Sequence, residues 1–322
     1  MSVEIRRVQR LGASSIVVTI PKEWARRMGI DVGSKVYLVD EGDSIRILPL
    51  EKDSGVPPEI PLPPIPGAAG SVVVCLYLSG LVEARLRPRG IPAREALMEL
   101  KRWALTLLGL QVAEAEDGSL IVKVALDSDK LDVGHMLRGI AADARGILSI
   151  LGRLLDGEPL DREELEVLEK DFQRNQHAII RYLMSRQGGA PNLASSYYAA
   201  LATGYLGFAV DILDDLLKML PPEGPRMDSS EAAAIKSLLK GLEDVIDLQA
   251  RILANPSFTR SGELLLAIRD LRQRIRESLS EARSPWAAVV LAKLHDVLRI
   301  LNLATYVTLC RVFTEQVIRG KR

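Results

Sequence analysis

The chain has 322 residues, with 42 Lys and Arg against 42 Asp and Glu, so its formal net charge is +0. This length is enough for two or three domains, and neutrality excludes a global basic field, so any contact with nucleic acid must be local. No stretch of about 18 apolar residues without a charge occurs, and the N-terminus lacks an apolar signal region. We therefore expect a cytoplasmic protein without membrane insertion.

The first 50 residues are predicted to form a small β-rich domain. Strands are expected at Ile5–Val8 and in the β-branched run Ser15–Ile20, which fits a buried strand. Pro21 suits the first position of a short helix that ends at Gly29. Two further short strands follow, joined by a Glu-Gly-Asp turn at 41–43. A domain this small buries too little surface alone, so we expect obligate dimerisation with interleaved strands.

This segment carries a local excess of positive charge. Between Val3 and Val39 there are seven cations and three anions, which leaves about +4. Dimerisation would double that charge on one surface, as binding to the DNA backbone requires. Ser14 and Ser15 are placed to donate hydrogen bonds to phosphate oxygens. From charge alone, an ordinary solvated face remains the alternative.

The pattern LG-x-SS-x-VVTIPKEWARRMGI-x-x-G-x-KVYL in this segment resembles the AbrB/SpoVT family of swapped-hairpin domains. The resemblance implies a homodimeric β fold whose basic face binds double-stranded DNA. The residues predicted to contact DNA are Arg6, Arg7, Arg10, Ser14, Ser15, Lys22, Arg26 and Arg27.

Residues 51–70 are predicted to be a linker, because seven prolines between positions 49 and 66 favour an extended polyproline-type spacer. A proline-rich ligand for a partner's aromatic groove is the alternative. Residues 71–130 are predicted to be a small α/β unit. Its elements are a buried strand SVVVCLYL at 71–78, a strand near 82–88, an amphipathic helix over 91–110 and a hairpin over 111–126. Such units often serve as ligand-sensing or pairing modules, but without a Gly-rich phosphate loop we prefer a structural connector.

The remainder of the chain is predicted to be all-α, in two three-helix units at 131–225 and 226–322. The expected helices are His135–Leu155, Arg162–Arg186, Leu193–Leu220, Glu231–Ala254, Glu263–Ala282 and Trp286–Arg319. Corresponding helices start about 95 residues apart, which indicates a duplication. The overall fold class is thus a multidomain α+β protein: a swapped-hairpin β domain, a small α/β unit and a tandem three-helix-bundle domain.

This domain order resembles the archaeal PhoU-family phosphate-uptake regulators that carry an AbrB-like head. The family has paired acidic residues that hold metal clusters, but here those positions have decayed. Gln173 replaces the acidic partner of Glu169 and Asp171, and Asp211 lacks its glutamate. Asp211 and Asp215 are spaced to share a cation, but we expect no metal and interpret residues 211–215 as a solvated acidic edge.

No catalytic constellation is found. The three histidines, His135, His177 and His295, lie on separate helices without metal-site spacing. The two cysteines, Cys75 and Cys310, have apolar neighbours and are predicted to be buried free thiols. We expect no enzyme activity and no cofactor.

Two functions remain. The first is a homodimeric transcription regulator of phosphate uptake whose helical half binds a protein partner or small effector. The second is an interaction protein whose head serves only dimerisation, or an architectural DNA binder. An antitoxin is disfavoured, because antitoxin chains are short and this one continues for some 270 residues.

Overall fold

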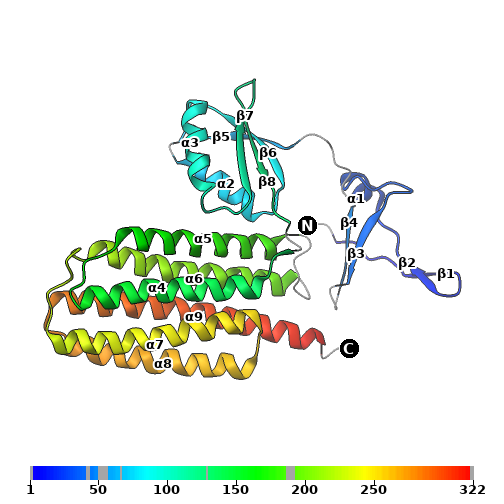
Figure 1. Ribbon diagram of the computed structural model, residues 1–322. Helices are drawn as coiled ribbons and strands as arrows, with labels where there is room; N and C mark the ends of the chain where they lie inside the picture. The colour runs from blue at the N-terminus through cyan, green and yellow to red at the C-terminus, as the bar shows by residue number, and fades with distance from the viewer. Residues whose placement is uncertain are drawn as a thin grey trace. The chain divides into compact units, whose positions relative to one another are not determined.

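The computed structural model describes residues 3–40, 44–49, 57–65, 67–127, 130–185 and 193–319. They form eight strands and nine helices (Figure 1). The chain divides into two compact units, Met1–Val56, here called the head, and Pro57–Arg322. This boundary lies within the stretch that the sequence predicts to be a linker.

The head contains two antiparallel strand pairs around one short helix. Strand β1 (Gln9–Leu11) pairs with β2 (Ser15–Val17), and β3 (Val36–Asp40) pairs with β4 (Ile45–Pro49). Helix α1 (Lys22–Arg27) lies between the pairs in sequence. The predicted order of elements is confirmed, although the first strand begins at residue 9 and not at 5. The predicted turn at 41–43 lies outside the described residues.

None of the described residues of the head is buried. The run Ser15–Ile20, predicted to be a buried strand, is exposed in the single chain, and the Ile16 side chain is 75% exposed. The physical reason is that each strand pair has no second layer of structure to pack against, so its apolar side chains have no partner.

The second unit begins with a four-stranded sheet, here called the α/β domain together with its two helices. The sheet order is β5-β6-β8-β7, with β5 parallel to β6 and the other neighbours antiparallel. Helices α2 and α3 cover one face of the sheet (Figure 1). The elements are β5 (Glu59–Leu62), α2 (Ala68–Leu78), β6 (Glu83–Pro88), α3 (Ala93–Trp103), β7 (Leu110–Glu114) and β8 (Leu120–Val124).

Two predictions for this region are wrong. The stretch 71–78 is not a strand but most of α2, because a short apolar run that is buried on several sides looks the same in sequence for either element. The stretch 51–70 is not a spacer throughout, since it contains β5 and the start of α2. Pro61 is tolerated in β5 because this strand lies at the edge of the sheet, where no second neighbour needs its missing N–H.

The rest of the second unit is the helical domain. Its helices are α4 (Val133–Leu155), α5 (Arg162–Met184), α6 (Leu193–Met219), α7 (Ser229–Ala254), α8 (Phe258–Glu281) and α9 (Pro285–Arg319). These bounds confirm the six predicted helices to within about five residues. Aspartates at 132, 161 and 228 and Ser257 cap four of them by accepting a hydrogen bond from a backbone N–H of the first turn.

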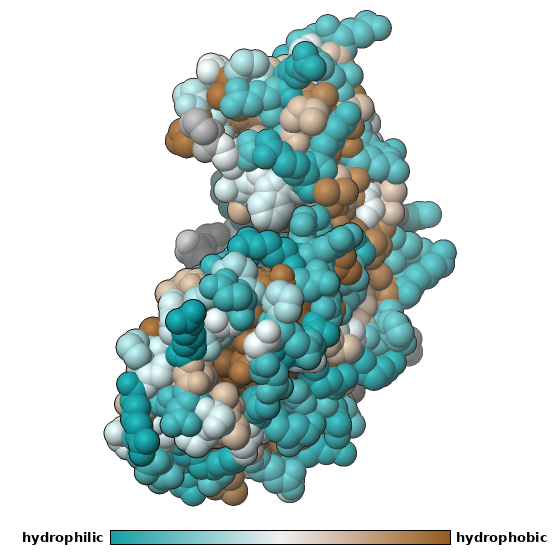
Figure 2. Space-filling model, turned by 60° about the vertical axis from the view of Figure 1, so that its left-hand side comes forward, coloured by the Kyte–Doolittle hydropathy of each residue, from teal (hydrophilic) through white to brown (hydrophobic). Residues whose placement is uncertain are grey.

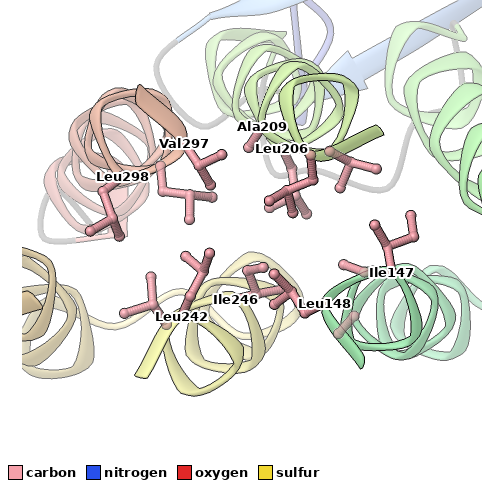
Figure 3. Close-up of a cluster of buried hydrophobic side chains, with 14 of the residues drawn as sticks. Ile147, Leu148, Leu206, Ala209, Leu242, Ile246, Val297 and Leu298 are labelled. Atoms are coloured by element: carbon pink, nitrogen blue, oxygen red, sulfur yellow. The ribbon is translucent and has the colours of Figure 1, made fainter. Parts of the chain in front are cut away.

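The six helices run side by side and share one hydrophobic core. Side chains from α4, α6, α7 and α9 point toward one another at its centre (Figure 3). α7 begins 96 residues after α4, at 229 against 133, in keeping with the predicted repeat. The two predicted three-helix units therefore do not have separate cores, because α4 packs on α7 and α6 packs on α9.

The surface is mostly hydrophilic on the face shown in Figure 2, with smaller hydrophobic areas between. Among the described helices, none is long and apolar enough to cross a membrane. Cys75 and Cys310 are both exposed, so the prediction of buried thiols is wrong. Each lies on a helix whose other faces supply the buried side chains.

Candidate nucleic-acid interface

All eight residues that the sequence predicts to contact DNA are exposed on the head. Their positions fall into two groups. Arg6 and Arg7 precede β1, Arg10 lies within it, and Ser14 and Ser15 lie at the turn into β2. Lys22, Arg26 and Arg27 belong to α1.

The β1–β2 hairpin brings the first group together. In its register Arg10 pairs with Ile16, and Leu11 pairs with Ser15, across a loop that starts at Gly12. Gly12 has a φ of 71°, a conformation that glycine adopts without a steric cost. The hairpin thus places a guanidinium and two hydroxyl groups within a few residues of one tight turn.

Helix α1 presents the second group. Pro21 is its N-cap and not its first residue, and Gly29, with a φ of 67°, follows its end as predicted. Lys22 and Arg26 are four residues apart and so lie on the same side of the helix. Arg26 and Arg27 lie in the last turn, where the partial negative charge of the helix end favours cations.

Most of these cations have no anionic partner within the described residues. Arg6 pairs with Glu4, and both side chains are largely exposed. The side chains of Arg7, Arg10, Lys22, Arg26 and Arg27 form no ion pair with the described part of the chain. These five positive charges, which no described carboxylate neutralises, are available for phosphate oxygens.

Beside this surface the head has an apolar groove of about 440 Å³. Its apolar lining consists of Val18, Ile20, Pro21, Trp24, Met28 and Ile47, and its polar lining of Glu4, Arg6 and Thr19. None of the apolar residues of this groove was predicted from the sequence to be functional. The sequence pattern that points to the groove is the spacing of Val18 and Ile20, two residues apart, which puts both side chains on one face of an extended segment.

A second group of predicted residues, the acidic positions of the helical domain, is only partly brought together. Glu169 on α5 and Asp214 on α6 both pair with Lys218, and the Lys218 Nζ to Glu169 Oε2 distance is 3.6 Å. Asp171 instead pairs with Arg174, at 2.8 Å. Asp214 is only 6% exposed, so the interpretation of residues 211–215 as a solvated edge is wrong at this position.

Burial and the closeness of these carboxylates to one another raise their pKa values. Burial raises the pKa of Glu169, and the neighbouring Asp214 raises it further. Burial likewise raises the pKa of Asp211, with added repulsion from Glu169, Asp214 and Asp215. Within the described ranges, no group of three or more His, Cys, Asp or Glu side chains is arranged to hold a metal ion.

A comparison with known protein families gives a match, and it lies in the head. Residues 9–54 match the family model described as antidote-toxin recognition MazE, bacterial antitoxin. This supports the expected AbrB-like character of the N-terminal domain. The match covers less than a sixth of the chain, and no curated protein and no solved structure matches the sequence.

Proposed function

We propose that the protein is a DNA-binding transcription regulator that acts as a homodimer through its head. The observation that carries this proposal is the combination, on one small domain, of exposed cations that pair with no described carboxylate and an exposed apolar surface. The match to a family of AbrB-like antitoxins supports it, since such domains typically dimerise and bind DNA.

The exposed apolar residues of the head support dimerisation. Ile16 is 75% exposed and Leu38 is 68% exposed in the single chain, although both lie in strands. Covering one such side chain stabilises an assembly by about 1.5–3 kcal/mol. A second head that inserts its strands against these residues and into the groove at Trp24 would supply the missing layer.

The charge of that dimer supports DNA binding. Each head contributes an excess of about four positive charges between Val3 and Val39, so two heads bring about +8 to one assembly. Contacts from these cations to phosphates would determine affinity, and the shape of the DNA would contribute much of the specificity. Ser14 and Ser15 at the hairpin turn would add hydrogen bonds to the phosphate backbone.

We also propose which process the protein controls. We assign it to phosphate uptake, with the helical domain as the part that binds a protein partner or effector. This rests on the resemblance in domain order and in the remaining acidic positions, Glu169, Asp171, Asp211 and Asp215.

The family match also favours a second candidate, an antitoxin that neutralises a protein toxin. An antitoxin binds its toxin through a tail that follows the head. In this chain the segment from Glu59 is already paired with β6 as an edge strand of a folded domain. It is therefore not free to wrap around a toxin, and the regulator remains the preferred function.

Binding of the full chain to mixed duplex DNA, measured by fluorescence anisotropy at several salt concentrations, tests the proposal. The logarithm of the association constant should fall linearly with the logarithm of salt, with a slope of about −0.9 for each neutralised phosphate. Arg10→Ala/Arg26→Ala removes four cations from the dimer and should reduce the magnitude of the slope by up to about 3.6.

The control variant is Arg94→Ala/Arg102→Ala, which removes the same charge from exposed positions on α3. It should bind DNA like the unaltered chain. Equal losses in both variants would mean that only net charge matters. An intact dimer that binds no DNA at low salt would contradict the regulator and leave the head as a dimerisation module.

A further inference from the structure

A groove of about 480 Å³ runs over α9 in the helical domain, far in sequence from the head. Its floor is formed by one face of α9, while α6 contributes Ile212 and α8 contributes Arg272. The residues from α9 are Asp296, Arg299, Ile300, Asn302 and Leu303. This volume is within the range of about 300–1,000 Å³ that is typical of small-molecule sites.

The groove has more positive than negative charge. Arg299 pairs with Asp296, at 3.5 Å between guanidinium and carboxylate. Arg272 forms no ion pair with the described residues, and its Nε atom is buried without a hydrogen-bond partner there. A buried donor that lacks an acceptor is costly, so an acceptor supplied from outside the chain would be stabilised at this point.

Several guanidinium groups lie close enough to His295 to lower its pKa. Burial lowers the pKa of this histidine first, and Arg272, Arg276 and Arg299 lower it further, against a smaller opposing effect of Asp296. Arg276 lies one helical turn after Arg272 on α8, and it too forms no ion pair with the described residues. Three guanidinium groups and one carboxylate therefore lie near His295, and two of those guanidinium groups, Arg272 and Arg299, line the groove.

The walls of the groove indicate the chemistry of a ligand. Guanidinium groups bind carboxylate and phosphate oxygens through paired N–H donors. Asn302 offers an amide that donates or accepts a hydrogen bond. Ile212, Ile300 and Leu303 form the apolar part of the lining and would contact a non-polar body.

We propose that this groove binds a small organic anion whose oxyanion head group, a phosphate or a carboxylate, lies against Arg272 and Arg299 while its apolar body covers Ile212, Ile300 and Leu303. The residues that line the groove include none from the head and none of the acidic positions Glu169, Asp171, Asp211 and Asp215. It gives the helical domain a ligand that the sequence motifs do not indicate.

The proposal is tested by isothermal titration calorimetry on the full chain without DNA, so that its result is separate from that of the DNA experiment. The probes are phenyl phosphate, benzoate, inorganic phosphate and the neutral benzyl alcohol. Phenyl phosphate or benzoate should bind at least tenfold more tightly than benzyl alcohol. The phosphate and carboxylate probes together distinguish the two kinds of head group.

Two variants of the groove should change the affinity in opposite directions. Arg272→Gln should weaken binding of the preferred probe at least tenfold. Asp296→Asn should strengthen it several-fold, because it removes the carboxylate that competes for Arg299. The control is Arg274→Gln, an exposed arginine of α8 that donates to Ser237 and does not line the groove; its affinity should be unchanged.

Three results would overturn the proposal. One is benzyl alcohol binding as tightly as the anions, which would make the groove merely apolar. Another is inorganic phosphate binding as tightly as phenyl phosphate, which would remove the role of the apolar wall. The third is tight anion binding that Arg272→Gln leaves unaltered while folding, followed by circular dichroism, is intact.

Discussion

The guanidinium of Arg181 lies over the ring of Tyr77, with 4.9 Å between its carbon and the ring centroid. The Arg181 Nη1 atom also donates to the Tyr77 carbonyl at 2.6 Å, and Nη2 donates to the Leu81 carbonyl at 3.0 Å. Arg181 belongs to α5 and is 2% exposed, while Tyr77 lies in the last turn of α2. One buried cation therefore caps the negative end of α2 and joins the α/β domain to the helical domain.

Replacement of Arg181 by Met should weaken this junction. The variant keeps an apolar side chain of similar length but leaves buried carbonyl groups without donors, which costs about 1–3 kcal/mol for each such group. We expect a loss of about 2–4 kcal/mol in the free energy of unfolding, measured by urea denaturation. A separate early transition of the α/β domain should accompany it.

The matched control is Arg174→Met on the same helix. Arg174 donates to the Leu105 carbonyl at 3.2 Å and pairs with Asp171, but its side chain is 41% exposed. Water can replace these contacts, so the loss should stay below about 1 kcal/mol. Equal losses in the two variants would refute the special role of the buried junction.

The head should depend on a second chain for its stability. Ile16→Asp places a charge on a strand residue that we propose is covered only in the dimer, and a dimer carries two such changes. The dissociation constant should rise by more than about 100-fold, since loss of two buried isoleucines corresponds to at least about 3 kcal/mol. Sedimentation equilibrium, with a chain mass of 35.3 kDa, measures this directly.

Leu266→Asp is the control for that experiment, because Leu266 is an exposed apolar residue of α8 in the helical domain. Its association state should equal that of the unaltered chain. A monomeric unaltered chain at micromolar concentration would contradict the proposed homodimer from the outset.

Asp143 on α4 should make stability fall as pH rises. Burial and the nearby Asp171 raise the pKa of this carboxyl, a hydrogen bond from Asn175 lowers it, and the net result is a pKa of about 6. The unfolded chain loses this proton near pH 3.8, so between about pH 4 and pH 6 the folded state binds more protons. This contribution is fully present at low pH and is lost by about pH 6.

Asp143→Asn removes that titration. Above pH 6 the variant should be more stable than the unaltered chain by on the order of 2 kcal/mol, and the difference should vanish near pH 4. Glu231→Gln should show the opposite pH dependence of stability, because hydrogen bonds from the backbone N–H groups of Arg283 and Ser284 lower the pKa of Glu231. Its loss of stability should appear at neutral pH and disappear in acid, in thermal melts at each pH.

Gly224 and Gly157 allow the cost of a strained backbone to be measured separately from the cost of a steric clash. Gly224 and Gly157 have φ values of 91° and 86°, so alanine at either costs about 1–2 kcal/mol. At Gly224 an added Cβ would also lie 2.5 Å from the Leu154 carbonyl oxygen, whereas at Gly157 nothing lies within 4 Å. Gly224→Ala should therefore lose about 1–3 kcal/mol more than Gly157→Ala in urea denaturation. Equal losses would contradict the contact.

The positions of most elements along the chain are readable from local sequence patterns. The six long helices follow from apolar periodicity and from the polar segments between helices. The head follows from its β-branched runs, its arginines and Gly29, because turns and short strands are specified by neighbouring residues. Local preferences act over a few residues and are therefore visible in sequence.

What each of those elements packs against depends on the three-dimensional arrangement of the chain. The run at 71–78 became a helix because it is buried against both the sheet and α5, a condition that no local pattern records. Asp214 is buried and Arg181 meets Tyr77 across 104 residues of sequence. The groove on α9 draws Ile212, Arg272 and Arg299 from three helices. Burial and electrostatic pairing depend on distances in space, and the packing of the helices sets those distances.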